Sequence, residues 1–241
     1  INKDPWLDKY LDATKLKEVD LIVELIGGSE GPAKKLVFNA LKNKKHVVTA
    51  NKALMAKYGD KLSKIAELKK VNLEFEAAVC GGVPIIRSLK EGLIANKISK
   101  IYGIFNGTSN YILSSMDKQN KSFDDVLFDA KNLGYAEANP SADLNGEDVS
   151  SKLKILSSLC FNSFLNDNIY VEGIKGIDKT DIDNANRLGY KIKLLGYSEL
   201  LKNKFYQRVH PTLIKKDSYV ASIDGVLNAV ITDGKPIGKN I

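Results

Sequence analysis

The 241-residue sequence contains few cysteines and few histidines. Its two cysteines, Cys80 and Cys160, are too few for the disulfide framework of a small secreted protein and are typical of a reducing cytosol. We therefore expect a cytoplasmic protein, and a chain of this length can bury a large core without disulfides or metal ions. His46 and His210 lie far apart in the sequence and lack metal-ligand spacing to a cysteine, so we expect both to be structural.

Long apolar runs and clustered arginines are also missing. No segment approaches the roughly 20 apolar residues that cross a bilayer, and no apolar stretch typical of a secretion signal follows the N-terminus. The net charge is 36 − 29 = +7, but the only arginines are Arg87, Arg187 and Arg208. Base readout favours arginine, and the lysines here are dispersed among acidic residues. The composition thus favours a solvated lysine-rich surface over contact with nucleic acid or membrane.

The first third of the chain alternates predicted strands and helices. Short β-branched runs predict strands at 20–26, 46–50 and 71–76. One predicted helix begins near Pro32, with an apolar face at helical spacing, and a second covers 54–70 with a possible break at Gly59. Strands separated by helices of this length predict βαβ units in a parallel sheet.

The pattern changes after Gly81 and Gly82, where strands and helices no longer alternate regularly. Predicted helices cover 83–92, 123–132 (capped by Ser122) and 145–160, and predicted strands cover 98–105, 204–209 and 225–231. We expect an α/β chain in which a partial Rossmann-type, parallel-sheet nucleotide domain precedes an α+β domain.

The residues with the clearest chemical potential lie between Ala130 and Lys152. On a helix, Asp148 and Lys152 would lie one turn apart, about 6 Å along one face. The carboxylate would keep the lysine charged, and the lysine could then protonate or stabilise a developing alkoxide. Glu137 and Asp143, in the preceding loop, could bind a substrate ammonium or hydroxyl. Taken alone, a purely structural role is the more common one for such residues: a surface ion pair between Asp148 and Lys152, or a capping box in which Asn145 caps the helix and Asp148 is its third residue.

The whole stretch, however, resembles the signature of the homoserine dehydrogenase family. The matching positions are Ala130, Gly134, Tyr135, Ala136, Asn139, Pro140, Asp143, Leu144, Gly146, Asp148 and Lys152. Three further segments resemble the cofactor-side lysine motif, the domain crossover and the substrate-domain turn of this family; they are 49–52, 76–84 and 106–113. The likeness extends from about Val19 to the end of the chain.

The resemblance implies NAD(P)H-dependent, reversible reduction of L-aspartate 4-semialdehyde to L-homoserine in threonine, methionine and isoleucine biosynthesis. Lys152 would donate a proton to the carbonyl oxygen, with Asp148 beside it. Hydride transfer leaves an alkoxide, so a cationic proton donor suits this position. The residues expected to bind the substrate are Glu137, Asp143, Thr108 and Tyr135.

The resemblance also implies a cofactor, an ion and a partner. Lys52, Ile26 and Gly27 would lie on the cofactor side, and the cofactor would be NADP or NAD. A sodium ion would be bound by Glu76 and by the residues at three further positions, which are Val79, Gly81 and Val83. The second domain of this family pairs subunits through its sheet, so we expect a homodimer.

A G-x-G-x-x-G phosphate-binding loop is missing from the sequence. We therefore expect residues 1–78 to be a partial NAD(P)-binding domain without its first βαβ unit. Residues 79–241 would form the substrate-binding and dimerisation domain without its C-terminal return segment. Two alternatives stay open: a related dehydrogenase of another amino-acid-derived aldehyde, and a non-catalytic dimerisation module.

Overall fold

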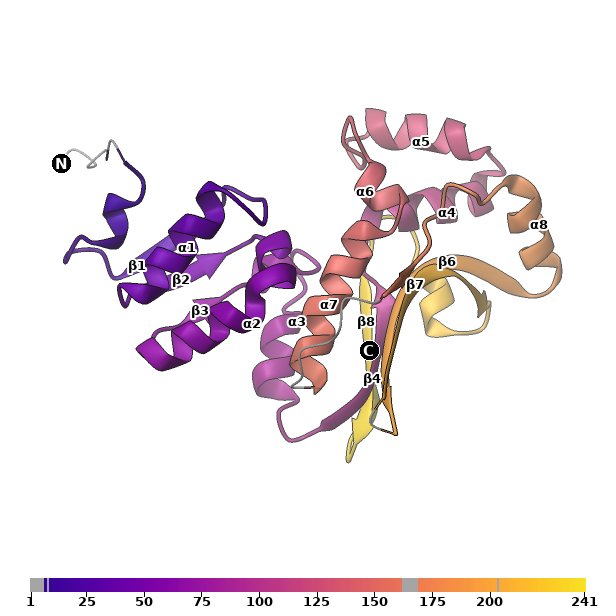
Figure 1. Ribbon diagram of the computed structural model, residues 1–241. Helices are drawn as coiled ribbons and strands as arrows, with labels where there is room; N and C mark the ends of the chain where they lie inside the picture. The colour runs from indigo at the N-terminus through magenta and orange to yellow at the C-terminus, as the bar shows by residue number, and fades with distance from the viewer. Residues whose placement is uncertain (1–6, 8, 162–168, 203) are drawn as a thin grey trace. The chain divides into compact units, whose positions relative to one another are not determined.

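The computed structural model describes residue 7 and the ranges 9–161, 169–202 and 204–241 (Figure 1). It divides into two compact units, with the division between Arg87 and Ser88. Over the described residues, no helix is long and apolar enough to span a membrane.

The first unit contains a three-stranded parallel sheet in the order β1-β2-β3, on which helices α1 and α2 pack. Its elements are η1 (Asp12–Thr14), β1 (Leu21–Glu24), α1 (Pro32–Lys42), β2 (His46–Thr49), α2 (Lys52–Lys69), β3 (Leu73–Glu74), η2 (Glu76–Ala78) and α3 (Ile85–Arg87). Alternation along the strands buries Ile22 and Val47, while Leu21 and Val23 are exposed. The parallel sheet predicted from the sequence is confirmed.

Two predictions in this unit were wrong in detail. Helix α2 runs through Gly59 without a break, because Leu54 and Leu62 on either side are buried and their packing outweighs the roughly 1 kcal/mol that a helical glycine costs. The strand predicted over 71–76 is limited to β3, since β3 lies at the sheet edge and the chain turns into η2 at Glu76.

The second unit is built on a six-stranded sheet in the order β5-β7-β6-β4-β8-β9. All its pairings are antiparallel except the parallel pairing of β5 with β7. Its elements are η3 (Ser88–Gly92), β4 (Lys97–Ile104), α4 (Gly107–Gln119), α5 (Phe123–Asn132), α6 (Ser141–Leu144), α7 (Glu147–Phe161), β5 (Tyr170–Val171), α8 (Lys179–Arg187), β6 (Tyr190–Leu201), β7 (Lys204–Lys215), η4 (Tyr219–Ser222), β8 (Ala229–Lys235) and β9 (Gly238–Asn240).

Both faces of this sheet contribute to the core. Helix α7 packs on β4 and β6, where the missing side chain of Gly196 leaves room for the ring of Phe105: a Cβ at Gly196 would lie 2.7 Å from it. The neighbouring Leu195 points to the opposite face and packs with Val220 of η4. The α+β character predicted for this part of the chain is confirmed.

The local predictions in this unit were accurate where a cap or a regular pattern defined the element. Ser122 accepts a hydrogen bond from the backbone of Asp125 and caps α5 at the predicted residue. The strand predicted over 225–231 was wrong in its first half, because β8 begins only at Ala229. The side chain of Asn110 instead binds the carbonyls of Ile223 and Leu227, which holds this segment against α4.

Candidate functional site

The centre of the site is the ion pair between Lys152 and Asp148 on α7. Lys152 Nζ lies 2.7 Å from Asp148 Oδ2 and donates a second hydrogen bond, of 2.7 Å, to the carbonyl oxygen of Phe105. Only 14% of the lysine side chain and 2% of the aspartate side chain are exposed. Asp148 is therefore buried and Lys152 largely so, which argues against the alternative of a solvated surface ion pair.

Asn106 joins a second carboxylate to this pair, and the sequence reasoning had not assigned it a role. Its Nδ2 donates hydrogen bonds of 2.7 Å to Asp143 Oδ1 and 2.9 Å to Asp148 Oδ2, and its Oδ1 accepts from the amide of Ser109 at 2.8 Å. An asparagine just before Gly107 at the start of a helix is a recognisable N-cap signal. The sequence signal thus indicates the cap, but not the two carboxylates that the same side chain holds.

The junction between β4 and α4 fixes the position of these groups. Phe105 and Asn106 follow β4 directly, and both are buried. The first residue of α4, Gly107, approaches the carbonyl of Val226 so closely that a Cβ there would lie 2.8 Å from its oxygen. Contacts with the sheet and with this loop thus fix the Phe105 carbonyl, which binds Lys152, and the Asn106 side-chain amide, which binds Asp143.

The other predicted substrate residues lie around the first turn of α4 and the loop after α5. Thr108 is buried and donates a 2.7 Å hydrogen bond to the carbonyl of Tyr135. Tyr135 is 43% exposed, and its ring packs at a tilt against that of Tyr111, with 4.9 Å between ring centroids. Glu137, two residues further on, is exposed to solvent. The structure therefore pairs Lys152 with Asp148 directly, joins Asp143 to Asp148 through Asn106, and links Thr108 to Tyr135. Among the described residues, no hydrogen bond joins Glu137 to either group.

The predicted cofactor-side residues lie at the carboxyl ends of β1 and β2. Ile26 is 55% exposed, and the amides of Ile26 and Gly27 donate hydrogen bonds of 2.7 and 2.9 Å to Glu24 Oε1. Gly27 has a φ of +84°, and apart from its two neighbours in the chain no atom of the described residues lies within 4 Å of the place where its Cβ would be. Lys52 is the exposed first residue of α2, which Asn51 caps. Backbone open on one side and a cation at a strand end suit a bound dinucleotide.

The predicted ion ligands surround the turn after β3. Both carboxylate oxygens of Glu76 accept backbone amides, Oε1 from Ile86 and Oε2 from Arg87, each at 2.8 Å. Gly81 has a φ of +53°. A carboxylate has about four lone-pair sites, so these two hydrogen bonds leave Glu76 able to bind a hard cation as well.

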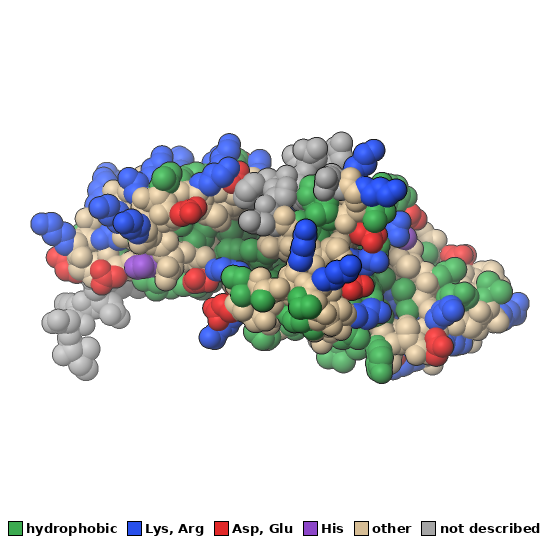
Figure 2. All heavy atoms as spheres, turned by 90° about the horizontal axis from the view of Figure 1, so that it is seen from below, with side chains coloured by type: hydrophobic (Ala, Val, Ile, Leu, Met, Phe, Trp, Pro, Cys, Tyr) green, Lys and Arg blue, Asp and Glu red, His purple; other side chains and the backbone are tan. Residues whose placement is uncertain are grey.

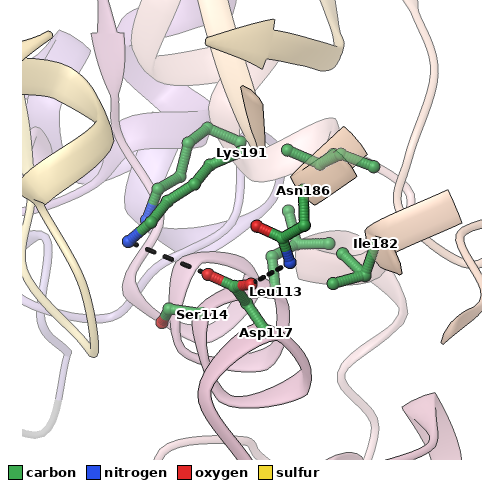
Figure 3. Close-up of a pocket in the computed structure, with 8 residues that line it drawn as sticks. Leu113, Ser114, Asp117, Ile182, Asn186 and Lys191 are labelled. Atoms are coloured by element: carbon green, nitrogen blue, oxygen red, sulfur yellow. Dashed lines mark hydrogen bonds and ion pairs between the residues drawn. The ribbon is translucent and has the colours of Figure 1, made fainter. Parts of the chain in front are cut away.

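A second, half-buried polar cluster is formed by side chains of α4, α8 and β6 and is shown in Figure 3. Asp117 Oδ1 accepts a 2.5 Å hydrogen bond from Asn186 Nδ2, and Asp117 Oδ2 lies 3.8 Å from Lys191 Nζ. The cavity here is only about 10 Å³, too small for a substrate.

Deeper in the same cluster, the fully buried Lys193 donates hydrogen bonds to Asp224 and Asn110 at 2.8 and 2.9 Å. Burial alone would raise the pKa of Asp224, but the hydrogen bonds from Lys193 and Lys118 lower it to about 2. The cluster therefore joins β6 and the loop before β8 to α4.

Charged side chains of both signs lie on the face of the molecule shown in Figure 2. On the face in Figure 2, lysine and arginine side chains occur on both units and stand beside aspartate and glutamate. Among the described residues, no group of three or more histidine, cysteine, aspartate or glutamate residues could hold a metal ion.

A parallel-sheet unit with open glycine backbone at its strand ends, followed in the sequence by an α+β unit with a largely buried lysine between a carboxylate and a carbonyl, is the arrangement expected of a two-domain protein of the dinucleotide-binding class. Comparison with known proteins agrees. The family described as "Homoserine dehydrogenase" matches residues 84–241, and "Homoserine dehydrogenase, NAD binding domain" matches residues 2–76. The chain belongs to the homoserine dehydrogenase family.

Individual relatives give the same result. The chain is 47% identical over 240 residues to homoserine dehydrogenase from Neisseria gonorrhoeae, covering 99% of this chain and 54% of that protein. A crystal structure of a homoserine dehydrogenase from Thiobacillus denitrificans superposes with a TM-score of 0.92 at 48% identity, covering 97% of this chain and 54% of that one. The chain thus spans about half the length of the curated relatives it matches.

A solved structure of lower sequence identity is a complex with NADPH. A hyperthermophilic archaeal homoserine dehydrogenase in complex with NADPH superposes with a TM-score of 0.83 at 26% identity, covering 99% of this chain and 69% of that chain.

Proposed function

We propose that the protein containing this chain catalyses the NAD(P)H-dependent, reversible reduction of L-aspartate 4-semialdehyde to L-homoserine, in threonine, methionine and isoleucine biosynthesis. The observation that carries the proposal is the largely buried Lys152, held between Asp148 and the carbonyl of Phe105. These two acceptors direct two of the three ammonium hydrogens, and we assign the third to the substrate carbonyl oxygen.

Lys152 and Asp148 would together manage the proton. When bound, the reduced nicotinamide supplies a hydride to the carbonyl carbon. The carbonyl oxygen then gains negative charge, which the ammonium of Lys152 stabilises and protonates. Asp148 pairs with the lysine ammonium, and the low exposure of the pair strengthens their attraction because water is largely excluded.

The carboxylates near this pair would orient the rest of the substrate. Asp143, tied to Asn106, and the exposed Glu137 would receive the substrate ammonium group, with Thr108 and Tyr135 lining the same pocket. An ammonium group donates three hydrogen bonds, so two carboxylates suit it.

The first unit would bind the cofactor. Residues 1–78 would be part of the NAD(P)-binding domain, with Ile26, Gly27 and Lys52 on the cofactor side, and residues 79–241 would bind substrate and pair subunits. The open space beside Gly27 supports close approach of a ligand to the backbone. Both NADP and NAD are compatible with these residues.

Three finer points belong to the same proposal. A sodium ion would bind Glu76 and the neighbouring backbone positions Val79, Gly81 and Val83. A homodimer would form through the sheet of the second unit, where Tyr102 and Tyr197 pair with 6.2 Å between ring centroids. A cytoplasmic location is supported by the low cysteine content.

The test is an enzyme assay on the full-length protein. We expect NADPH or NADH oxidation with L-aspartate 4-semialdehyde and formation of homoserine, and a much lower kcat/KM with other amino-acid-derived aldehydes. A higher kcat/KM with another aldehyde would favour the related-dehydrogenase alternative. No turnover with any aldehyde, in protein that binds no dinucleotide, would reject a catalytic function. Light scattering that shows a monomer would reject the homodimer.

A further inference from the structure

Glu24, the last residue of β1, is a carboxylate buried at the strand end with 0% exposure. Its Oε1 accepts the amides of Ile26 at 2.7 Å and Gly27 at 2.9 Å, and its Oε2 accepts the hydroxyl of Thr49 at 2.6 Å. These three donors belong to the ends of two neighbouring strands. Burying a carboxylate is costly unless donors surround it, and these three hydrogen bonds offset that cost. The carboxylate therefore ties the ends of the two strands to one arrangement.

A second layer of hydrogen bonds extends the cluster to α2. Thr49 Oγ1 also accepts the amide of Asn51 at 3.0 Å. The Asn51 side chain donates to the carbonyl of Gly28 at 2.8 Å and accepts the amide of Leu54 at 3.0 Å, which caps α2. Lys52 is the first residue of that helix. One connected set of hydrogen bonds therefore runs from Glu24 to both the 26–28 loop and the start of the lysine-bearing helix.

Apolar packing does not account for the position of this loop. Leu25 is 75% exposed and Ile26 is 55% exposed. Gly27 and Gly28 have φ values of +84° and +79°, and beyond their chain neighbours no atom in the described part of the chain lies within 4 Å of either Cβ position. A loop that buries so little surface needs polar contacts to hold one conformation, and Glu24 and Asn51 supply such contacts.

We propose that Glu24 is a positioning residue that fixes the 26–28 loop relative to Lys52, so that both meet the bound dinucleotide in one geometry. This inference rests on the proposed function. Glu24 directs both oxygens toward protein donors and is itself inaccessible, so it acts through the loop and not by contact with the ligand. Its loss would lower cofactor affinity because the loop would have to be ordered during binding.

The test compares three variants of the full-length protein. Glu24→Ala removes the acceptor for all three donors, whereas Glu24→Gln keeps one oxygen for the amides of Ile26 and Gly27. Glu67→Gln, an exposed glutamate on α2, is the matched control. Fluorescence titration measures the equilibrium Kd for NADPH, and steady-state turnover measures KM for the aldehyde. Hydrogen exchange of the free protein measures how well the backbone amides of residues 25–28 are protected.

We expect Glu24→Ala to raise the Kd for NADPH at least about tenfold, with faster exchange in the 25–28 loop, while KM for the aldehyde changes less than about twofold. Glu24→Gln should recover most of the affinity, and Glu67→Gln should match wild type. A folded Glu24→Ala protein with wild-type Kd and wild-type exchange would overturn the inference. Glu24→Gln as weak as Glu24→Ala would also overturn it, since the retained acceptor would then have no effect.

This inference and the proposed function fail in distinguishable ways. A wild-type protein that binds NADPH without reducing the aldehyde would reject the proposed activity, and the Kd comparison would still decide the role of Glu24. A wild-type protein that binds no dinucleotide would reject both the cofactor assignment and the ligand-related role of Glu24.

Discussion

Replacement of Asn106 should damage the site more than any other change of a neutral side chain in it. The side chain makes three hydrogen bonds, one as the cap of α4 and two to Asp143 and Asp148. Loss of a helix cap costs about 1 kcal/mol. Each lost hydrogen bond to a carboxylate costs about 1.5 kcal/mol or more, so Asn106→Ala should lower the free energy of unfolding by about 4 kcal/mol.

Two further variants separate these contributions. Asn106→Ser keeps a cap-forming hydroxyl but cannot reach both carboxylates, so it should recover only about 1 kcal/mol relative to alanine. Asn106→Asp keeps the cap and places a third carboxylate beside Asp143 and Asp148, so it should be no more stable than the serine variant. Asn132→Ala, at an exposed asparagine that ends α5, is the matched control and should change stability by less than about 0.5 kcal/mol.

Urea unfolding followed by circular dichroism measures the stabilities, and steady-state kinetics measure kcat. Because Asn106 fixes the carboxylate that holds Lys152, kcat of the folded serine variant should fall about 10- to 100-fold, while the Kd for NADPH stays at the wild-type value. The reasoning fails if Asn106→Ala unfolds within about 0.5 kcal/mol of wild type, or if the serine variant keeps full kcat.

Three further predictions concern residues outside this junction. The pKa of Asp224 is about 2, below its ordinary value of 3.8, so its ionised form stabilises the fold above pH 4 and this stabilisation is lost as the pH falls toward 2. Asp224→Asn should therefore cost about 1 to 2 kcal/mol at pH 7 in thermal or urea unfolding, and a cost that persisted unchanged at pH 2 would contradict this. Glu137→Gln should raise KM for the aldehyde about tenfold with little change in kcat, and an effect on kcat alone would argue against a role in ground-state binding. Glu76→Gln should abolish the difference between turnover in sodium chloride and turnover in potassium chloride, and a difference that survived would place the ion elsewhere.

The sequence predicts well those elements that local rules define. The helix capped by Ser122 and the apolar face of α1 follow from residue spacing alone, and the pairing of Lys152 with Asp148 follows from their four-residue separation. The break predicted at Gly59 was wrong because local propensity competes with tertiary packing, and packing prevails when both flanking turns are buried.

The roles of Glu24 and Asn106 could not be predicted in the same way. Glu24 lies within a β-branched run, and nothing nearby in the sequence shows whether its side chain faces solvent or is buried beside the neighbouring strand. Its burial depends on Thr49, which is 25 residues away in the sequence. The bonds of Asn106 to two carboxylates likewise join positions 37 and 42 residues apart. Long-range contacts decide both roles, whereas spacing along the sequence describes only neighbours on one element.

The most direct test of the account is single-turnover hydride transfer in the Lys152→Met variant of the full-length protein. The substitution removes the ammonium while largely keeping the length of the side chain, and stopped-flow fluorescence follows NADPH oxidation by L-aspartate 4-semialdehyde. The account predicts a rate lower by about 10²- to 10⁴-fold with an unchanged Kd for NADPH. A Lys152→Met protein that transfers hydride at the wild-type rate would contradict the central role of this lysine.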